Sequence, residues 1–600
     1  MDAFSELSIT PTWEGFDRSV IKKKLNHVAY LDESRVKNIY ARLGPAGRAI
    51  LDVLPYLIHF NQASLPGYVK NCPAGIETFH PTQRGYRRLR LLIQAFDERV
   101  ARQEHRQIFG LYLMGSAGSV GQNNSSDIDF WVCTEENSVE PLARKLELLS
   151  KWARELGVDL QGFAVHPQQF DGQPERTRSQ LLLDEFYRSA CRLAGRPLLW
   201  WVLPARGRNL MDKTDLVHEL DQHRLLDISK FVHFGQIGPL TKIDLYAAGL
   251  HAIEQAFATP YKGLLKLGLL VAYAHGGTLL SEHVKQQSLY ATGGDRDYPD
   301  VYSVLAQYLQ DHFGSTQFWT LLQRAWLAKT TYRNYTLSED ENWQRVVKGW
   351  NLEPSIIAQA RSYAGQSFST ALAETKEITQ GIQNLATEIF ALQPPAHDLP
   401  NTTLQQARRI RQVLDYFSGR PSFVLPMLRW STHSSLWRIE FKAESASHPW
   451  IVREDNELVT THRTLIEAVC WSFNNTISPN THGADAIQNV QLRHWFRVAR
   501  GALKGQRILC VNADQDFLQG QPAQIGHVEP IAEKISDACV IVCVSYPNPI
   551  GRLLDVTRYD EPSQVLELIR EDSNLVIVGS TILGSQTLVE ALQTYSDING

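Results

Sequence analysis

Residues 109–133 read FGLYLMGSAGSVGQNNSSDIDFWVC, and this stretch carries most of the information about the fold. It begins with a short apolar run, FGLYLM, which ends at a Gly-, Ser- and Asn-rich segment from Gly115 to Ser126. A second run, DIDFWVC, extends from Asp127 to Cys133. Short apolar runs bounded by turn residues are typical of buried β-strands. We therefore expect two strands joined by a glycine-rich turn.

The residues that follow predict a helix and a third strand. Residues 140–156 place their leucines on one helical face, and Gly157 ends the pattern. Residues 158–165 (VDLQGFAV) have the length and composition of a strand. The order strand, glycine-rich turn, strand, helix, strand predicts a small α/β sheet.

Outside this sheet, hydrophobic periodicity separates a helical region from strand-rich ones. Residues 46–62 predict a helix interrupted near Pro55, and residues from about 178 to 395 are mainly helical in pattern. Residues 421–460 predict β-strands with turns. After residue 507 three apolar runs predict further strands, at 507–513, 538–545 and 574–580.

Length and composition narrow the classes of protein. The 600 residues allow about three to five domains at roughly 100–200 residues each. Lys plus Arg number 60 and Asp plus Glu 64, so the net charge of −4 argues against a polybasic nucleic-acid binder. Seven cysteines without a CxxC pair argue against a disulfide scaffold. We find neither a signal peptide nor an apolar run long enough for a membrane span, and we expect a cytoplasmic protein.

The glycine-rich turn and the carboxylates after it predict a phosphate-handling site. Small residues at Gly115 and Ser116 let a backbone approach a phosphate and donate its amides. Asp127 and Asp129, two residues apart on a strand, point to the same face and can hold Mg²⁺. Asp159, at the start of the next strand, is placed to supply a third carboxylate. Three such groups on adjacent strands fit a two-metal phosphoryl or nucleotidyl transfer site.

Simpler interpretations exist for each part of this pattern. A lone DxD pair is most often a turn or edge-strand feature, and Asp159 by itself could face solvent. The full spacing of Gly-Ser, about ten small or polar residues, and DxD within a strand pair favours the functional interpretation. The segment is neither a Walker A loop, since no GK[ST] follows, nor a Rossmann fingerprint, since no helix starts at its glycines.

The Gly-Ser…DxD pattern resembles the nucleotidyltransferase fold of the DNA polymerase beta superfamily. More narrowly, MGSAGSVGQNNSSDIDFWVC is similar to the signature of the class I (enterobacterial-type) adenylate cyclases. Further similar blocks are GPAGRAILDVLPYLIHF, LPGYVKNCPAGIETF, LLLDEFYRSACRLAGRPLLWWVLP and TPYKGLLKLGLLVAYA. We expect the resemblance to cover about three quarters of the chain, to about residue 475.

The resemblance implies conversion of ATP to 3′,5′-cyclic AMP and pyrophosphate, with Mg²⁺ or Mn²⁺ as the cofactor. The implied catalytic and metal-binding residues are Asp127, Asp129 and Asp159. The implied nucleotide- and phosphate-binding residues are Gly115, Ser116, Ser119, Lys262 and Lys266. Trp131 belongs to the same signature, although a strand tryptophan is more often a core residue. Residues 181–195 (LLLDEFYRSACRLAG) predict a helix, on which Arg188 and Arg192 lie four residues apart. The two arginines could face the triphosphate, but ion pairs with Asp184 and Glu185 are the preferred interpretation.

Two positions depart from the family pattern. Position 118 is Gly where the family is expected to have a small hydroxyl residue, so one phosphate hydrogen bond would be absent. Position 271 is Val where relatives are expected to have Glu. Residues 480–600 do not resemble the family's regulatory region, so sugar-transport phosphorelay control is not implied and the regulatory partner is unknown.

The predicted architecture is α+β: a polymerase-beta-like nucleotidyltransferase sheet, a large helical region and a small C-terminal α/β domain. Its expected parts are an N-terminal helical region (1–104), a catalytic core (105–205), a helical domain completing the nucleotide site (206–395), a mixed α/β region (401–480) and a C-terminal domain of unknown role (481–600).

Two other functions remain open at this point. The first is a different nucleotidyltransferase, which moves AMP to a macromolecule or a small molecule. The second is a catalytically degenerate paralogue that binds nucleotide and signals through its C-terminal domain.

Overall fold

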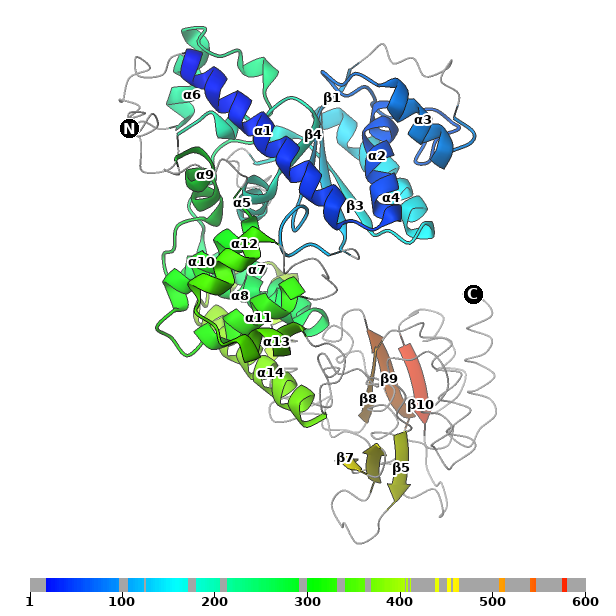
Figure 1. The fold of residues 1–600 in the computed structure, drawn as a ribbon, viewed down its shortest axis with the longest axis vertical. Helices are drawn as coiled ribbons and strands as arrows, with labels where there is room; N and C mark the ends of the chain where they lie inside the picture. Colours follow the sequence, from blue (N-terminus) through cyan, green and yellow to red (C-terminus); the bar gives the residue numbers. More distant parts are fainter. Residues whose placement is uncertain are drawn as a thin grey trace. The chain divides into compact units, whose positions relative to one another are not determined.

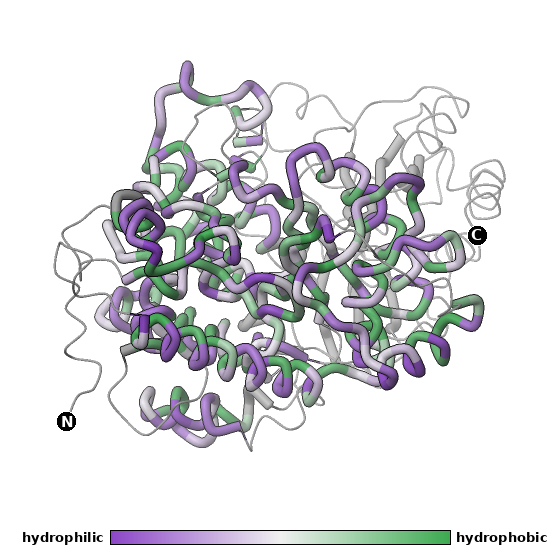
Figure 2. Tube along the Cα trace, turned by 90° about the horizontal axis from the view of Figure 1, so that it is seen from above, coloured by the Kyte–Doolittle hydropathy of each residue, from purple (hydrophilic) through white to green (hydrophobic). Residues whose placement is uncertain are grey.

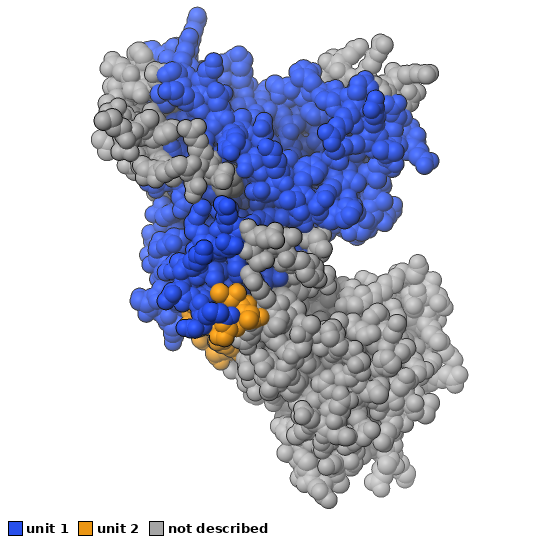
Figure 3. Space-filling model, viewed as in Figure 1, with its two compact units in different colours: residues 1–245, 272–319, 326–354 blue, residues 246–271, 320–325, 355–600 orange. Residues whose placement is uncertain are grey.

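A computed structural model describes most of the first 411 residues and six later strands. The described ranges are 18–96, 106–123, 126–170, 180–204, 213–290, 299–331, 340–361, 368–404, 406–407 and 410–411, with the strand backbones 437–441, 450–454, 457–462, 507–512, 540–546 and 575–579. The chain forms two compact units, coloured separately in Figure 3. The first comprises residues 1–245, 272–319 and 326–354, and the second comprises residues 246–271, 320–325 and 355–600.

A four-stranded sheet organises the first unit. Its strands, in the order β3-β2-β1-β4, are β1 (Ile108–Met114), β2 (Ile128–Thr134), β3 (Leu160–Val165) and β4 (Cys191–Gly195). β1 is antiparallel to both β2 and β4, whereas β2 and β3 are parallel. The parallel pair is possible because α4 (Val139–Glu155) returns the chain to the same end of the sheet. This mixed sheet among many helices confirms the predicted α+β class.

One face of the sheet forms the main hydrophobic core. The facing pair Leu113 and Phe130, and the facing pair Leu111 and Val132, belong to this core with the apolar faces of α2 (Pro45–His59) and α4. In Figure 1, α2 and α4 lie on one side of the strands and α5 (Gln180–Ser189) lies on the other. Figure 2 shows hydrophilic and hydrophobic residues along the same helices, as expected where one helical face packs and the other meets water.

The opposite face carries Trp131 and, two residues earlier on the same strand, Asp129. Trp131 is 1% exposed and stacks on Phe186 of α5 with ring centroids 4.1 Å apart. Phe170 and Phe234 complete this aromatic cluster. Trp131 therefore packs in a core, and the cluster seals the middle of this face while its end near Asp129 is left less buried.

The other helices of the described chain pack around these layers or form the second unit, and four of them, α7, α8, α11 and α13, have residues in both units. They are α1 (Arg18–Arg42), α3 (Gln83–Leu92), α6 (Lys213–Gln222), α7 (Lys242–Ala258), α8 (Pro260–Ala274), α9 (Leu280–Tyr290), α10 (Val301–Phe313), α11 (Trp319–Thr331), α12 (Glu341–Gly349), α13 (Pro354–Arg361) and α14 (Phe368–Ala391).

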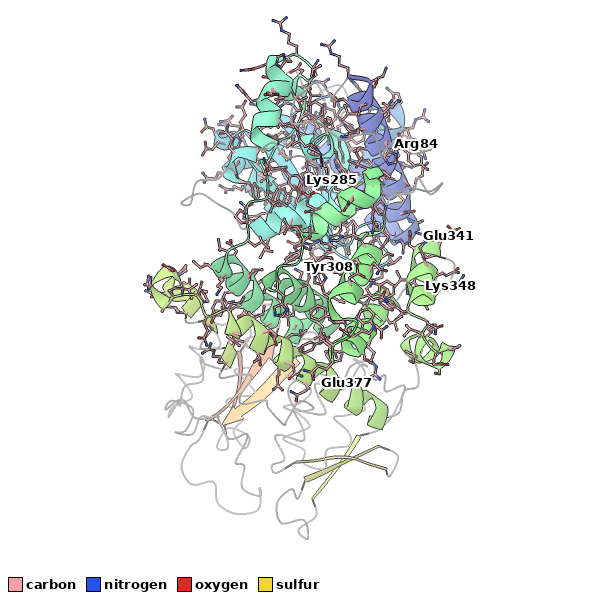
Figure 4. The ribbon with its side chains drawn as sticks, turned by 90° about the vertical axis from the view of Figure 1, so that its left-hand side faces the viewer. Arg84, Lys285, Tyr308, Glu341, Lys348 and Glu377 are labelled. Atoms are coloured by element: carbon pink, nitrogen blue, oxygen red, sulfur yellow. The ribbon has the colours of Figure 1, made fainter. Side chains whose placement is uncertain are left out.

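Two buried lysines fix α1 and α9 to the short helical turn after β4. Lys24 of α1 donates to the carbonyl oxygen of Val202 at 2.9 Å, and Lys285 of α9, labelled in Figure 4, donates to that of Trp200. Burial lowers the pKa of Lys24 to about 8. These bonds place α1 beside the sheet, where its later turns reach the loop between β1 and β2.

Two local predictions were wrong. Pro55 does not interrupt the helix predicted over 46–62, because α2 runs continuously from Pro45 to His59 with Pro55 inside it. The missing proline amide removes one helical hydrogen bond, and the burial of neighbouring Leu54 and Leu57 compensates for the loss. Residues 191–195, predicted as part of a helix, form β4 instead, because they pair with β1.

The later strands of the second unit agree with the sequence patterns. β5 (Trp437–Phe441), β6 (Trp450–Glu454) and β7 (Glu457–His462) form one antiparallel sheet. β8 (Arg507–Asn512), β9 (Val540–Tyr546) and β10 (Leu575–Gly579) form another, with β9 in the centre. The predicted strand segment 422–430 and the stretches between β8, β9 and β10 lie outside the described residues. Among the helices described, none combines the length and the apolar character that crossing a bilayer requires.

Candidate functional site

A tight loop between β1 and β2 forms one wall of the candidate site. Gly115 and Gly118 adopt φ angles of +75° and +77°, the left-handed conformation that glycine tolerates best. Ser119 donates its amide and its hydroxyl to the carbonyl oxygen of Ser116, at 3.1 and 2.7 Å. The loop is therefore a preformed structure with its own hydrogen bonds.

Asp127 and Asp129 lie directly beside this loop. Asp127 precedes β2, and Asp129 pairs in register with Met114, the last residue of β1. Both side chains are half-buried. A Cβ added at Gly115 would lie 3.2 Å from the Asp129 Oδ2, so the carboxylate lies over the glycine. The Gly-Ser turn and the Asp129 carboxylate are thus adjacent in space.

Asp159 lies close in the backbone, but its carboxylate has another partner. It precedes β3, and its carbonyl oxygen accepts the amide of Ile128 at 2.9 Å, so it neighbours Asp127 across the parallel pair. Its exposed side chain accepts from the Gln161 Nε2 at 2.7 Å. The structure brings Asp159 to the same end of the sheet without joining its carboxylate to the other two.

The carboxylate oxygens of Asp127 and Asp129 can be compared with the ligands that a divalent cation requires. Asp127, directly before β2, and Asp129, on β2, offer carboxylate oxygen ligands, which suit Mg²⁺ or Mn²⁺. Within the described ranges, no three His, Cys, Asp or Glu side chains lie close enough together to hold a metal ion. The pair therefore fits a cation that takes its remaining ligands from phosphate oxygens or water, as Mg²⁺ commonly does.

Aromatic and acidic groups from other elements border the same end of the sheet. Tyr302 of α10 packs against the loop, since a Cβ added at Gly121 would lie 2.7 Å from its ring. Burial, followed by the nearby carboxylates of Glu185 and Asp127, raises the pKa of the Tyr302 hydroxyl. The Tyr302 hydroxyl therefore lies within range of the negative charges of Glu185 and Asp127.

Arg188 is held by a buried carboxylate on the same helix. Its Nη1 donates to the Asp184 Oδ2 at 2.6 Å, and its Nη2 lies 3.8 Å from Glu185, which confirms the predicted ion pairs. Burial opposes the charge of Arg188, but the Asp184 carboxylate outweighs it and raises the arginine pKa. Arg192 was wrongly placed on this helix, because it lies on β4 and pairs with Asp32 at 3.5 Å.

The two predicted phosphate lysines lie on α8, in residues that belong to the second unit. Both side chains are half-buried, and Lys266 donates to the Gln255 Oε1 at 3.2 Å. Their predicted contact with phosphate stays a prediction. Val271 on the same helix is 1% exposed, so a glutamate in its place would have to enter a buried environment.

Gly118 has a structural explanation that differs from the expected loss of a phosphate ligand. A Cβ added there would lie 2.7 Å from Arg35 Cγ and 3.0 Å from the Arg35 carbonyl oxygen. The glycine thus allows α1 to approach the loop, and it faces that helix.

We expect Gly118→Ser to lower the free energy of unfolding by about 2–5 kcal/mol. Left-handed strain of about 1–2 kcal/mol adds to an overpacking cost of about 1–3 kcal/mol. The matched control is Gly157→Ser, because Gly157 has φ +76° and nothing within 4 Å of its added Cβ. Denaturant unfolding of both variants measures the difference, and equal losses would contradict the contact with α1.

Sequence reasoning missed three residues that hold the loop. Arg35 of α1 donates from Nε to the carbonyl oxygen of Ala117 at 2.8 Å. Asp300, which caps α10, accepts the amide of Val120 at 2.7 Å. Ser189 of α5 accepts the amide of Gly115 at 3.0 Å. Each is far from the loop in sequence, and no local pattern marked it.

Comparisons with known proteins agree with the resemblance seen in the motifs. Residues 20–201 match the family model described as adenylate cyclase NT domain. Proteins described as adenylate cyclase are similar to the chain: those of Salmonella typhimurium (33% identity over 286 residues) and Escherichia coli (33% over 288) each align with 44% of this chain, and that of Haemophilus influenzae (30% over 350) aligns with 53%. No solved structure matches the chain. The resemblance to class I adenylate cyclases is confirmed.

The extent of the similarity is smaller than expected. The alignments cover about half of this chain, not three quarters. In turn, the chain spans 33% of the length of the Salmonella and Escherichia relatives and 41% of the Haemophilus one. The matched family segment contains the loop, both DxD carboxylates and Asp159.

Proposed function

We propose that the chain is an adenylate cyclase that converts ATP to 3′,5′-cyclic AMP and pyrophosphate. The observation that carries the proposal is the Asp129 carboxylate lying over Gly115, at the junction of a phosphate-type loop and a DxD strand. This junction lies inside residues 20–201, which match the adenylate cyclase NT domain. The names of the similar proteins support the same reaction.

In the proposed reaction the ribose 3′-oxygen attacks the α-phosphorus of the same ATP molecule. The bond from this oxygen to phosphorus forms, the bond to the pyrophosphate oxygen breaks, and the hydroxyl proton goes to a carboxylate, for which Asp159 is the predicted acceptor. Because nucleophile and phosphate belong to one molecule, the protein contributes mainly orientation and charge stabilisation.

The loop and the two carboxylates divide these tasks. The loop from Gly115 to Ser119 would bind the triphosphate through backbone amides and the Ser116 hydroxyl. Asp127 and Asp129 would hold Mg²⁺ or Mn²⁺ against the phosphates. When bound, such a cation neutralises phosphate charge and lowers the pKa of the attacking hydroxyl. Tyr302 packs against the loop at Gly121, and Trp131 stacks on Phe186 on the sheet face that also carries Asp129.

Product analysis tests this function. The purified full chain is incubated with ATP labelled at the α-phosphate and Mn²⁺, and the products are separated by chromatography. The chain is expressed in a host that lacks its own adenylate cyclase. A parallel preparation from the same host without the expressed chain controls for contaminating enzymes. We expect labelled cyclic AMP in stoichiometric balance with pyrophosphate.

Other outcomes would overturn the proposal. Labelled AMP attached to a co-purifying macromolecule would indicate another nucleotidyltransferase. Binding of ATP without any product, across both metals and a range of pH, would indicate a nucleotide-binding protein without catalysis.

A further inference from the structure

We propose that Arg35 of the N-terminal helix α1 is a positioning residue for the phosphate loop, and that it aims the amides of Ser116 and Ala117 at the triphosphate. This inference rests on the proposed function, because it names how that site would bind its substrate.

Most amides of residues 115–122 are already used inside the protein. The acceptors are Ser189 Oγ for Gly115, Gln122 Oε1 for Gly118, the Ser116 carbonyl for Ser119, Asp300 Oδ2 for Val120, Ser119 Oγ for Gly121 and the Ser119 carbonyl for Gln122. Among the residues that the structure describes, the amides of Ser116 and Ala117 have no acceptor. These two are therefore the loop donors left for a ligand, and two successive amides of this kind form an anion-binding nest.

The direction of each remaining amide follows from the carbonyl of its own peptide. In a planar trans peptide the C=O and the following N–H point in opposite directions. Arg35 Nη2 lies 3.5 Å from the carbonyl oxygen of Gly115, so the Ser116 amide is turned away from α1. Ser119 holds the carbonyl of Ser116 from both its amide and its hydroxyl, which turns the Ala117 amide away from Ser119.

Arg35 is built into this arrangement and is itself removed from solvent. It is 1% exposed, and its Nε donates to the carbonyl oxygen of Ala117 at 2.8 Å. One guanidinium thus holds two carbonyls of the same loop, a geometry that a lysine cannot reproduce. The absence of a side chain at Gly118 leaves room for the Arg35 stem.

The same geometry assigns Ser119 a role different from direct phosphate contact. Its side chain is 2% exposed, and its hydroxyl donates to Ser116 and accepts from Gly121 at 3.2 Å. Ser119 therefore shapes the loop from inside, together with Arg35.

Binding of inorganic triphosphate to the full chain tests the proposal without requiring turnover. We expect Arg35→Lys to weaken triphosphate binding, measured by calorimetry, by roughly tenfold or more, because a small displacement of binding groups is costly. Arg196→Lys is the matched control, since Arg196 forms a two-point ion pair with Glu77 away from the loop. Its triphosphate affinity should stay within about twofold of the parent.

Hydrogen exchange resolved to single amides distinguishes positioning of the loop from a general contribution of Arg35 to stability. A general contribution would not change which amides triphosphate protects. Triphosphate should protect the amides of Ser116 and Ala117 in the parent chain, and this protection should be lost in folded Arg35→Lys. If that variant does not fold, Ser119→Ala replaces it, with the same expected loss.

Three results would overturn the inference. They are unchanged affinity in a folded Arg35→Lys, equal weakening in Arg196→Lys, and triphosphate protection that excludes both amides. A parent chain that binds triphosphate in this Arg35-dependent way but makes no cyclic AMP would refute the proposed function and leave the loop assignment intact.

Discussion

Replacing Asp129 by Asn is expected to lower the rate of cyclic AMP formation by about 10³-fold. The change keeps the size of the side chain and removes the negative charge that lies over Gly115. Without that charge the site would lose a ligand for the divalent cation, and the phosphates would lose the positive charge that compensates them. Initial rates at saturating ATP and Mn²⁺ measure the effect, and circular dichroism shows whether the fold is kept.

Two further variants make this prediction specific. Asp311→Asn is the matched control, because Asp311 is exposed on α10 and accepts a hydrogen bond from Gln307 of the same helix. It should retain the parent rate. Asp159→Asn tests the third predicted carboxylate: a loss as large as that of Asp129→Asn would support its role as proton acceptor. A folded Asp129→Asn with the parent rate would remove the basis of the proposed reaction.

The largest effect on stability is expected for Asp184→Ala, with a loss of about 3–5 kcal/mol in the free energy of unfolding. Asp184 is completely buried and accepts from Arg188, from the Tyr273 hydroxyl at 2.8 Å and from the Ser281 amide at 3.1 Å. Removing the carboxylate would leave the Arg188 charge in a largely buried position without its closest partner.

The control for Asp184→Ala is a variant of a solvent-exposed ion pair. Asp227 and Lys230 lie 3.2 Å apart with exposed side chains, and Asp227→Ala should leave the unfolding midpoint unchanged. Urea unfolding followed by tryptophan fluorescence measures both variants. A small loss for Asp184→Ala would show that the network around α5 and α9 contributes little to stability.

Local sequence patterns were sufficient for the strands that frame the site. β1, β2 and β3 begin or end within about two residues of their predicted bounds, because short apolar runs between turn residues identify buried strands. The spacing of Asp127 and Asp129 predicts that both carboxylates share one face, since strand side chains alternate. The structure places Asp129 on β2 and Asp127 directly before it. The same local rules predicted the later strands β8, β9 and β10.

Other elements were decided by partners distant in the sequence. β4 was predicted as helix because its residues, CRLAG, have no strong strand pattern, and its pairing with β1 determined its structure. Pro55 was expected to break a helix, and burial of the surrounding side chains kept the helix continuous. In both cases tertiary contacts outweighed local preference.

The amino-acid sequence alone determined the chemistry available to this protein: a glycine-serine loop, two carboxylates at strand spacing and no excess of positive charge. Only the tertiary structure decided how that loop is held, through Arg35 from α1, Ser189 from α5 and Asp300 from α10. It also decided that Gly118 faces a helix. The physical reason is that spacing along the chain fixes which residues share a strand or a turn, whereas hydrogen bonds between distant segments depend on the packed arrangement of the whole unit.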